Sequence, residues 1–341
     1  MPGENPAVTP VPPFRPAPWL PGPHAQTLFG ALCRRIRLPF RREALGTPDG
    51  DELVLDHLDP PGEPPPARLL VLHGLEGSSY SASVGSLLAA AWRRGLAATA
   101  LNFRSCARDP RDRRRSLPNR RPRLYHSGET SDLGFVVEAL ATRELSTPLL
   151  LAGVSLGGNV LMKWLGENPG QRSVRAAAAI SVPFDLAAGA RHLETPLGRL
   201  YVRSFVRTLA SKAERIASRF PRAAARIDLA RARRATTFFE FDDAATAPLH
   251  GFAGAEDYWE RSSSLRFLGS VATPALCLGA EDDPFLPAEA LRRAARAASP
   301  SVTVVVEPRG GHCGFWTGAT PFTARSHAAE TAVSWLSDRL A

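Results

Sequence analysis

A serine between two glycines is the chain's most informative chemical signal. Ser155 is the centre of residues 153–157, Gly-Val-Ser-Leu-Gly, which match the pattern G-x-S-x-G. An apolar run at residues 149–152 predicts a buried strand before it, and spaced apolar residues at 160–165 predict a helix after it. A serine on a sharp strand-to-helix turn projects its hydroxyl from the sheet edge, as a nucleophile requires. The alternative is a serine that only caps the helix.

A serine hydroxyl is a weak nucleophile, so it needs a general base. A predicted strand at residues 302–306 leads through Gly310 and Gly311 to His312. Two glycines before a histidine suit a loop that approaches other backbone closely. We therefore predict that His312 is the base.

The base in turn needs a carboxylate that orients it. A predicted strand at residues 274–279 runs into three adjacent acids, Glu281-Asp282-Asp283. The spacing D-x-x-x-P from Asp283 to Pro287 favours Asp283, and Asp282 is the alternative. The order of nucleophile, acid and base along the chain predicts a catalytic triad of Ser155, Asp283 and His312.

An oxyanion that forms during acyl transfer needs hydrogen-bond donors. The predicted strand at residues 69–72 ends in His73-Gly74-Leu75-Glu76-Gly77, whose backbone N–H groups could face the serine. We predict that the N–H groups of Leu75 and Leu156 form the oxyanion hole. For His73 itself, the structural interpretation, in which it holds the turn, is favoured over a chemical one.

Most of the chain alternates apolar runs with helical stretches. This rhythm predicts an α/β fold with a mostly parallel central sheet flanked by helices. Residues 185–265 break the rhythm with arginine-rich helical sequence, which predicts a helical cap inserted over the sheet. The predicted parts are an N-terminal extended arm packing on the core (1–45), the first part of the core (46–184), the cap (185–265) and the second part of the core (266–341).

Composition limits the cellular setting and the partners. The chain has 42 basic and 33 acidic residues, for a net charge of +9, and its 4 cysteines lack metal-ligand spacing. No signal peptide and no apolar run of membrane-spanning length are visible, so a cytoplasmic protein with reduced thiols is predicted. The one basic run, at 108–123, is interpreted as a solvated loop; peripheral contact with anionic lipid through it and the cap is the functional alternative. No nucleic-acid partner is expected.

Several motifs together resemble the YheT-like group of α/β-hydrolases, bacterial relatives of the α/β-hydrolase-domain 1 and 3 proteins. They are Trp19-Leu20 with His24-Ala25-Gln26-Thr27, the segments 73–79 (HGLEGSS), 102–106 (NFRSC) and 125–130 (YHSGET) with Asp132, and residues 153–159. The resemblance covers nearly the whole chain. It departs at 108–123, which is longer and more basic than the family usually shows there, and in the unusually arginine-rich cap.

The resemblance implies an α/β-hydrolase fold and a carboxylic ester hydrolase that works without metal or cofactor. It places the family's triad on Ser155, Asp283 and His312. The expected substrates are small-molecule esters, with short- to medium-chain acyl groups or of acylglycerol or other lipid-like type. An acyltransferase with the same triad is the alternative, and a basic binding protein for nucleic acid or anionic membrane is a more distant one. For His126 and Asp132 in the family motif, structural hydrogen bonding is the favoured interpretation.

Overall fold

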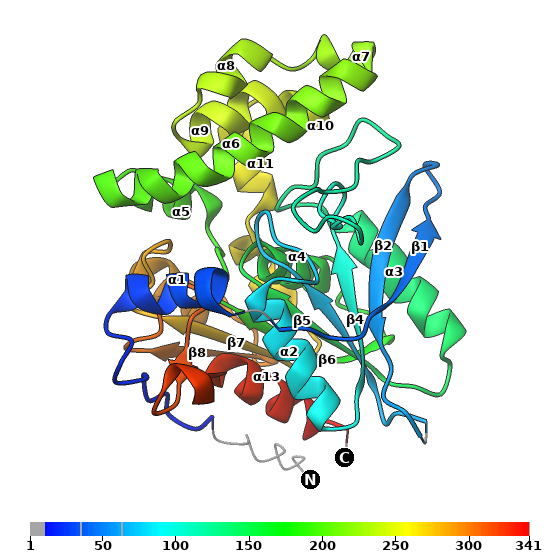
Figure 1. Ribbon diagram of the computed structural model, residues 1–341, viewed down its shortest axis with the longest axis vertical. Coiled ribbons are helices and arrows are strands. Elements are labelled where there is room, and N and C mark those ends of the chain that lie inside the picture. The colour runs from blue at the N-terminus through cyan, green and yellow to red at the C-terminus, as the bar shows by residue number, and fades with distance from the viewer. Residues whose placement is uncertain (1–10, 35, 63, 341) are drawn as a thin grey trace.

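A computed structural model describes residues 11–34, 36–62 and 64–340 (Figure 1). Its centre is an eight-stranded sheet in the order β1-β2-β4-β3-β5-β6-β7-β8. The six strands from β4 to β8 in that order are parallel, and β1 and β2 join one edge antiparallel. The strands are β1 (Arg41–Gly46), β2 (Glu52–Leu58), β3 (Arg68–Leu72), β4 (Ala97–Asn102), β5 (Leu149–Val154), β6 (Val174–Ile180), β7 (Ala275–Ala280) and β8 (Val302–Glu307).

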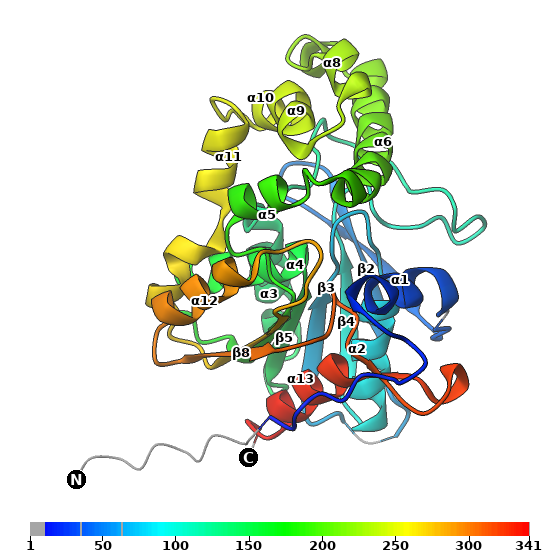
Figure 2. The ribbon, with the colours of Figure 1, turned by 90° about the vertical axis from the view of Figure 1, so that its left-hand side faces the viewer.

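Helices cover both faces of the sheet (Figure 2). One face packs against α2 (Ala82–Arg93) and α13 (His327–Ser337). The other packs against α3 (Ser131–Arg143), α4 (Leu156–Glu167) and α12 (Ala288–Ala297). Because both faces are covered, every residue of β3, β4, β5 and β7 is buried, which explains their continuous apolar runs.

A helical layer is inserted between β6 and β7 and stands above the sheet in Figure 1. Its longest helix is α6 (Pro196–Arg219), which buries Val202, Val206 and Leu209 toward the rest of the chain. The other elements of this segment are α5 (Leu186–His192), α7 (Pro221–Ala224), α8 (Leu229–Arg234), α9 (Phe238–Phe241), a π-helical turn η1 (Asp242–Thr246), α10 (Ala247–His250), α11 (Ala255–Ser262) and η2 (Ser264–Ser270).

The predicted extended arm over residues 1–45 is wrong in two places. Residues 23–33 form helix α1 (Pro23–Cys33), which begins at a proline, a residue suited to the first helical position. Residues 41–46 form strand β1, whose backbone pairs with β2 from Arg41 opposite His57 to Gly46 opposite Glu52. Residues 1–10 lie outside the described part of the chain.

A small hairpin closes the fold beside α1. It consists of β9 (Trp316–Thr317) and β10 (Arg325–Ser326), joined by the short helix η3 (Pro321–Thr323). Trp316 is buried against Phe29 of α1, so the two ends of the described chain pack together. Among the described residues, no helix is both long and apolar enough to cross a bilayer.

Candidate active site

Ser155 occupies a strained turn between β5 and α4. Its backbone angles, φ 51° and ψ −120°, lie in a region that non-glycine residues rarely adopt. The neighbouring glycines are required by contact: a Cβ on Gly153 would lie 2.6 Å from the Gly157 carbonyl oxygen, and one on Gly157 would lie 2.6 Å from the His73 oxygen. The turn therefore holds Ser155 at the carboxyl edge of the sheet.

Replacing Gly157 with alanine is expected to destabilise the protein by about 1–3 kcal/mol, because the new methyl group would push the first turn of α4 away from the backbone at the end of β3. Gly170→Ala is the matched control, since a Cβ there meets nothing within 4 Å. The control is expected to change the unfolding free energy by less than about 0.5 kcal/mol. Urea denaturation of both variants measures the difference, and equal midpoints would contradict the steric account.

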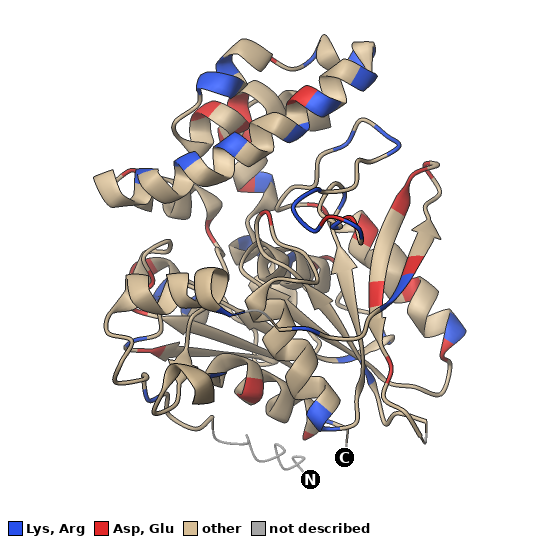
Figure 3. Cartoon of the chain, in the orientation of Figure 1, with Lys and Arg blue, Asp and Glu red and all other residues tan. Residues whose placement is uncertain are grey.

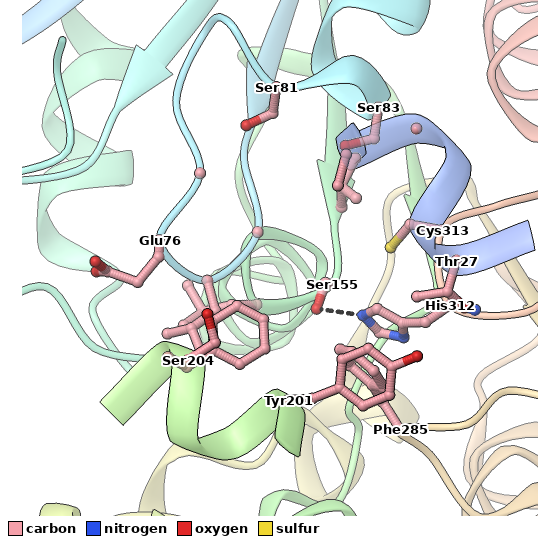
Figure 4. Close-up of a pocket in the computed structure, with 18 of the residues that line it drawn as sticks. Thr27, Glu76, Ser81, Ser83, Ser155, Tyr201, Ser204, Phe285, His312 and Cys313 are labelled. Atoms are coloured by element: carbon pink, nitrogen blue, oxygen red, sulfur yellow. Dashed lines mark hydrogen bonds between the residues drawn. The ribbon is translucent and has the colours of Figure 1, made fainter. Parts of the chain in front are cut away.

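Ser155, His312 and Asp283 form one row of hydrogen bonds. Figure 4 shows the bond between Ser155 and His312. The His312 Nδ1–H donates to Asp283 Oδ2 at 2.8 Å, because an ionised carboxylate can only accept. The other ring nitrogen, Nε2, is then free to accept from the Ser155 hydroxyl, 2.9 Å away. Ser155 directly follows β5, and Asp283 and His312 lie in the loops that follow β7 and β8.

The two candidate acids have different partners. Asp283 is buried, and its Oδ1 accepts the backbone N–H groups of Phe285 at 2.8 Å and Leu286 at 3.2 Å. Asp282 accepts the backbone N–H of Gly311 at 2.9 Å, in the loop that carries the histidine. Asp283 thus contacts the imidazole of His312, whereas Asp282 stabilises the loop that carries His312.

The environment of His312 favours its charged form. Burial alone would lower the pKa of its imidazole, but the Asp283 carboxylate raises that pKa well above the ordinary value. The ring also stacks on Phe285, with centroids 4.4 Å apart. An imidazole held this way can take up a proton from Ser155 and keep its orientation.

Helix α1 supports the histidine loop from the other side. The backbone N–H of His312 donates to Thr27 Oγ1 at 2.9 Å. The buried side chain of Gln26 binds both backbone groups of Trp316. The sequence alone does not indicate these contacts of Gln26 and Thr27, because they join residues more than 280 positions apart.

The turn after β3 lies directly against the serine. A Cβ on Gly74 would be 3.2 Å from Ser155 Cβ, and the turn is closed by a 3.0 Å bond from Gly77 N–H to the Gly74 oxygen. Within the described chain, the N–H groups of Leu75 and Leu156 donate to no protein acceptor. Both residues line the same cavity as Ser155.

His73 holds this turn in place. Its Nδ1–H donates to the Gly74 oxygen at 2.7 Å, and its Nε2 accepts the backbone N–H of Phe103 at 3.1 Å. Burial lowers the pKa of His73 to about 4, so the ring is neutral and can do both. These contacts match a structural role.

A buried cluster that sequence reasoning missed joins the turn to the helical segment. Glu76, at φ 54°, donates its N–H to Tyr125 Oη at 2.6 Å, and the Tyr125 hydroxyl donates to Glu76 Oε1 at 2.8 Å. Lys212 of α6 donates to the same Oε1 at 2.5 Å. Burial would raise the pKa of Glu76, but the Lys212 ammonium holds it below the ordinary value. The cluster fixes a turn residue whose backbone is strained.

A cavity of about 1050 Å³ opens beside Ser155 and His312. It exceeds the range of roughly 300–1,000 Å³ that is common for ligand pockets. Its apolar walls come largely from the helical segment and from the loop after β7: Leu186, Leu193, Phe205, Leu209, Phe238, Trp259, Phe285 and Leu286. It is also bordered by α1 and by Arg111, Arg113 and Arg114.

The remaining motif residues serve other contacts. Asp132 pairs with Arg104 at 2.7 Å, and Arg104 also pairs with Asp51 at 2.8 Å, all three buried. The buried His126 packs against His250, with ring centroids 4.6 Å apart. No group of three or more His, Cys, Asp or Glu side chains in the described ranges could hold a metal ion.

Comparison with known proteins identifies related sequences. Residues 67–319 match a family described as having the alpha/beta hydrolase fold. The putative esterase YheT of Escherichia coli is 34% identical over 297 residues, which cover 86% of this chain and 84% of that protein. The mouse phospholipase ABHD3 is 30% identical over 319 residues, covering 90% of this chain and 74% of its own length.

Solved structures show the same fold at low sequence identity. A 2,6-dihydroxy-pseudo-oxynicotine hydrolase superposes with a TM-score of 0.55 at 16% identity, covering 93% of this chain and 72% of that one. The Pyrococcus furiosus esterase Pf2001 gives 0.51 at 16% identity, covering 89% of each. These matches confirm the predicted fold class.

Proposed function

Since the chain belongs to the α/β hydrolases related to YheT and ABHD3, we propose that it is a serine hydrolase of carboxylic esters. The observation that carries the proposal is the hydrogen bond from Ser155 to His312 within the row that ends at Asp283. Relatives named as an esterase, a phospholipase and a yeast monoacylglycerol lipase support an ester substrate.

Acylation begins when Ser155 Oγ attacks the ester carbonyl carbon while His312 Nε2 accepts its proton. Asp283 stabilises the imidazolium and keeps Nδ1 protonated. The N–H groups of Leu75 and Leu156 bind the oxyanion of the tetrahedral intermediate. His312 then returns the proton to the departing alkoxide, which leaves an acyl group on Ser155.

Deacylation repeats the steps with water. His312 takes a proton from a water molecule, which attacks the acyl-enzyme carbonyl. The intermediate collapses, the proton passes to Ser155 Oγ, and the carboxylic acid leaves. The apolar walls beneath α6 and α9 suit the acyl chain. Their extent favours acyl groups of several carbons, and esters of lipid type, over acetate.

The same residues would also serve an acyltransferase, in which an alcohol replaces water. Hydrolysis of p-nitrophenyl butyrate with added methanol or glycerol separates the two. A hydrolase that uses an acyl-enzyme is expected to give mainly free acid at low alcohol concentration. The ratio of new ester to free acid should be the same for esters with different leaving groups, because all of them form the same acyl-enzyme. New ester formed faster than free acid would assign a transferase instead.

Replacing Lys212 with methionine is expected to lower kcat by about 10- to 100-fold with little change in KM. The change leaves the half-buried Glu76 beside Tyr125 without its counter-charge, so the strained turn that presents the Leu75 N–H loses an anchor. Lys212→Arg is expected to restore part of the loss. Steady-state kinetics on one soluble ester measure both parameters.

Arg215→Met is the matched control, because Arg215 lies on the same helix and also bridges to the core. It binds Ser116 in the basic loop at 3.0 Å and does not touch the turn. Its kcat is expected to stay within about twofold of wild type. Equal losses in the two variants would mean that Lys212 acts only by docking the helix.

A further inference from the structure

The exposed apolar side chains gather on two helices at the cavity mouth. Seven large apolar side chains of the described chain are exposed, and four of them belong to α1 and α6. These are Leu28 and Leu32 of α1 and Leu197 and Leu200 of α6, of which Leu32 is 73% and Leu200 63% exposed. Exposed leucines are common singly, but a group beside one opening marks an interaction surface.

The two helices meet at the mouth. His24 Nδ1 of α1 lies 2.9 Å from Tyr201 Oη of α6, and the two rings stack. Both views of the ribbon place α6 above α1 (Figures 1 and 2). Leu28 and Leu32 line the cavity together with Tyr201. Leu28 and Leu32 are thus exposed on the rim of the cavity, and Leu197 and Leu200 lie within one turn of Tyr201 on α6.

Positive charge continues the same face. On α6, Arg203 and Arg207 follow Leu200 by three and seven positions, so the three residues lie on the same face of the helix. The salt bridges of the described cap use other cations, among them Lys212 and Arg233, and leave these two arginines without a carboxylate partner. Figure 3 shows Lys and Arg recurring along α6 and in the loop of residues 108–123.

We propose that this entrance face, formed by the exposed leucines of α1 and α6 with Arg203 and Arg207, docks on an anionic lipid surface. Leucines enter the boundary between headgroups and acyl chains, while arginines bind the negatively charged headgroups. The net charge of +9 favours such a surface over a neutral one. A docked protein would open its cavity directly onto the bilayer.

Flotation with vesicles tests the proposal without any measurement of catalysis. Vesicles of equal parts phosphatidylglycerol and phosphatidylcholine are expected to bind the wild-type chain, and pure phosphatidylcholine vesicles are expected to bind it at least tenfold more weakly. Leu197→Ser/Leu200→Ser should weaken binding to the anionic vesicles about tenfold. Arg203→Ser/Arg207→Ser should weaken it about 25-fold, since each arginine near an anionic leaflet contributes about fivefold.

Leu145→Ser is the matched control, because Leu145 is 89% exposed in the loop between α3 and β5. It is expected to bind like wild type, and thermal melts check that every variant is folded. Equal binding of wild type and both double variants would overturn the proposal. Binding of the protein to DNA but not to vesicles would also overturn it. The same holds if no vesicle binds and the wild-type chain forms a dimer that the Leu197→Ser/Leu200→Ser variant does not form.

Discussion

Replacing Ser155 with alanine is expected to lower kcat for ester hydrolysis on the order of 10⁶-fold, as large a loss as removing the whole triad. Without Oγ no acyl-enzyme can form, and only the binding of substrate and the oxyanion donors remains. These two contributions should keep the rate of the variant roughly 10³–10⁴-fold above that of the uncatalysed reaction in water. Hydrolysis of p-nitrophenyl butyrate by highly purified variant protein measures the loss.

The folded state should survive this change. Alanine at position 155 adopts the same strained backbone as serine, and the Ser155 N–H bond to the Ile180 oxygen at 2.8 Å is kept. The melting temperature is therefore expected to stay close to that of wild type. A folded Ser155→Ala protein that hydrolyses the ester at the wild-type rate would remove the serine from the mechanism.

Asp283→Asn is expected to lower kcat about 10⁴-fold. An asparagine can offer its NH₂ group to His312 Nδ1, which stabilises the tautomer with hydrogen on Nε2. That tautomer cannot accept the Ser155 proton. The pH profile adds a second readout, because the Asp283 carboxylate raises the pKa of His312. The base must be neutral, so loss of this charge should move the acidic limb of kcat/KM to lower pH.

Asp282→Asn is the control for this prediction. The side chain accepts the Gly311 N–H, and an asparagine oxygen can accept the same bond. Its kcat is expected to fall less than tenfold, with the acidic limb unmoved. A larger loss in Asp282→Asn than in Asp283→Asn would exchange the roles of the two acids.

Local sequence predicted the elements around Ser155 well, because the chemistry of the turn is local. The glycines at 153 and 157 and the apolar strand before them are neighbours in the chain. Strand β1 was missed because Arg41–Gly46 has no run of apolar residues, and its pairing with β2 decides its conformation.

Long-range contacts could not be predicted in the same way. Asp282 and Asp283 are adjacent, and only the path of the chain after β7 decides which one reaches His312. In the sequence, nothing distinguishes Lys212 from the other basic residues of α6. Its contact with Glu76 depends on how α6 packs over the turn after β3. The spacing from Asp283 to Pro287 favoured Asp283 and the family resemblance agreed with it, but neither indicated the contact between Lys212 and Glu76.

The most direct test of the central claim is the site of covalent labelling by a fluorophosphonate. Such probes react with a serine whose hydroxyl is activated by a base, as the bond to His312 predicts for Ser155. Peptide mass spectrometry of the labelled wild-type protein is expected to find one adduct, on Ser155, and none in folded His312→Ala. Labelling on a different residue, or equal labelling of Ser155 in the two proteins, would contradict the account.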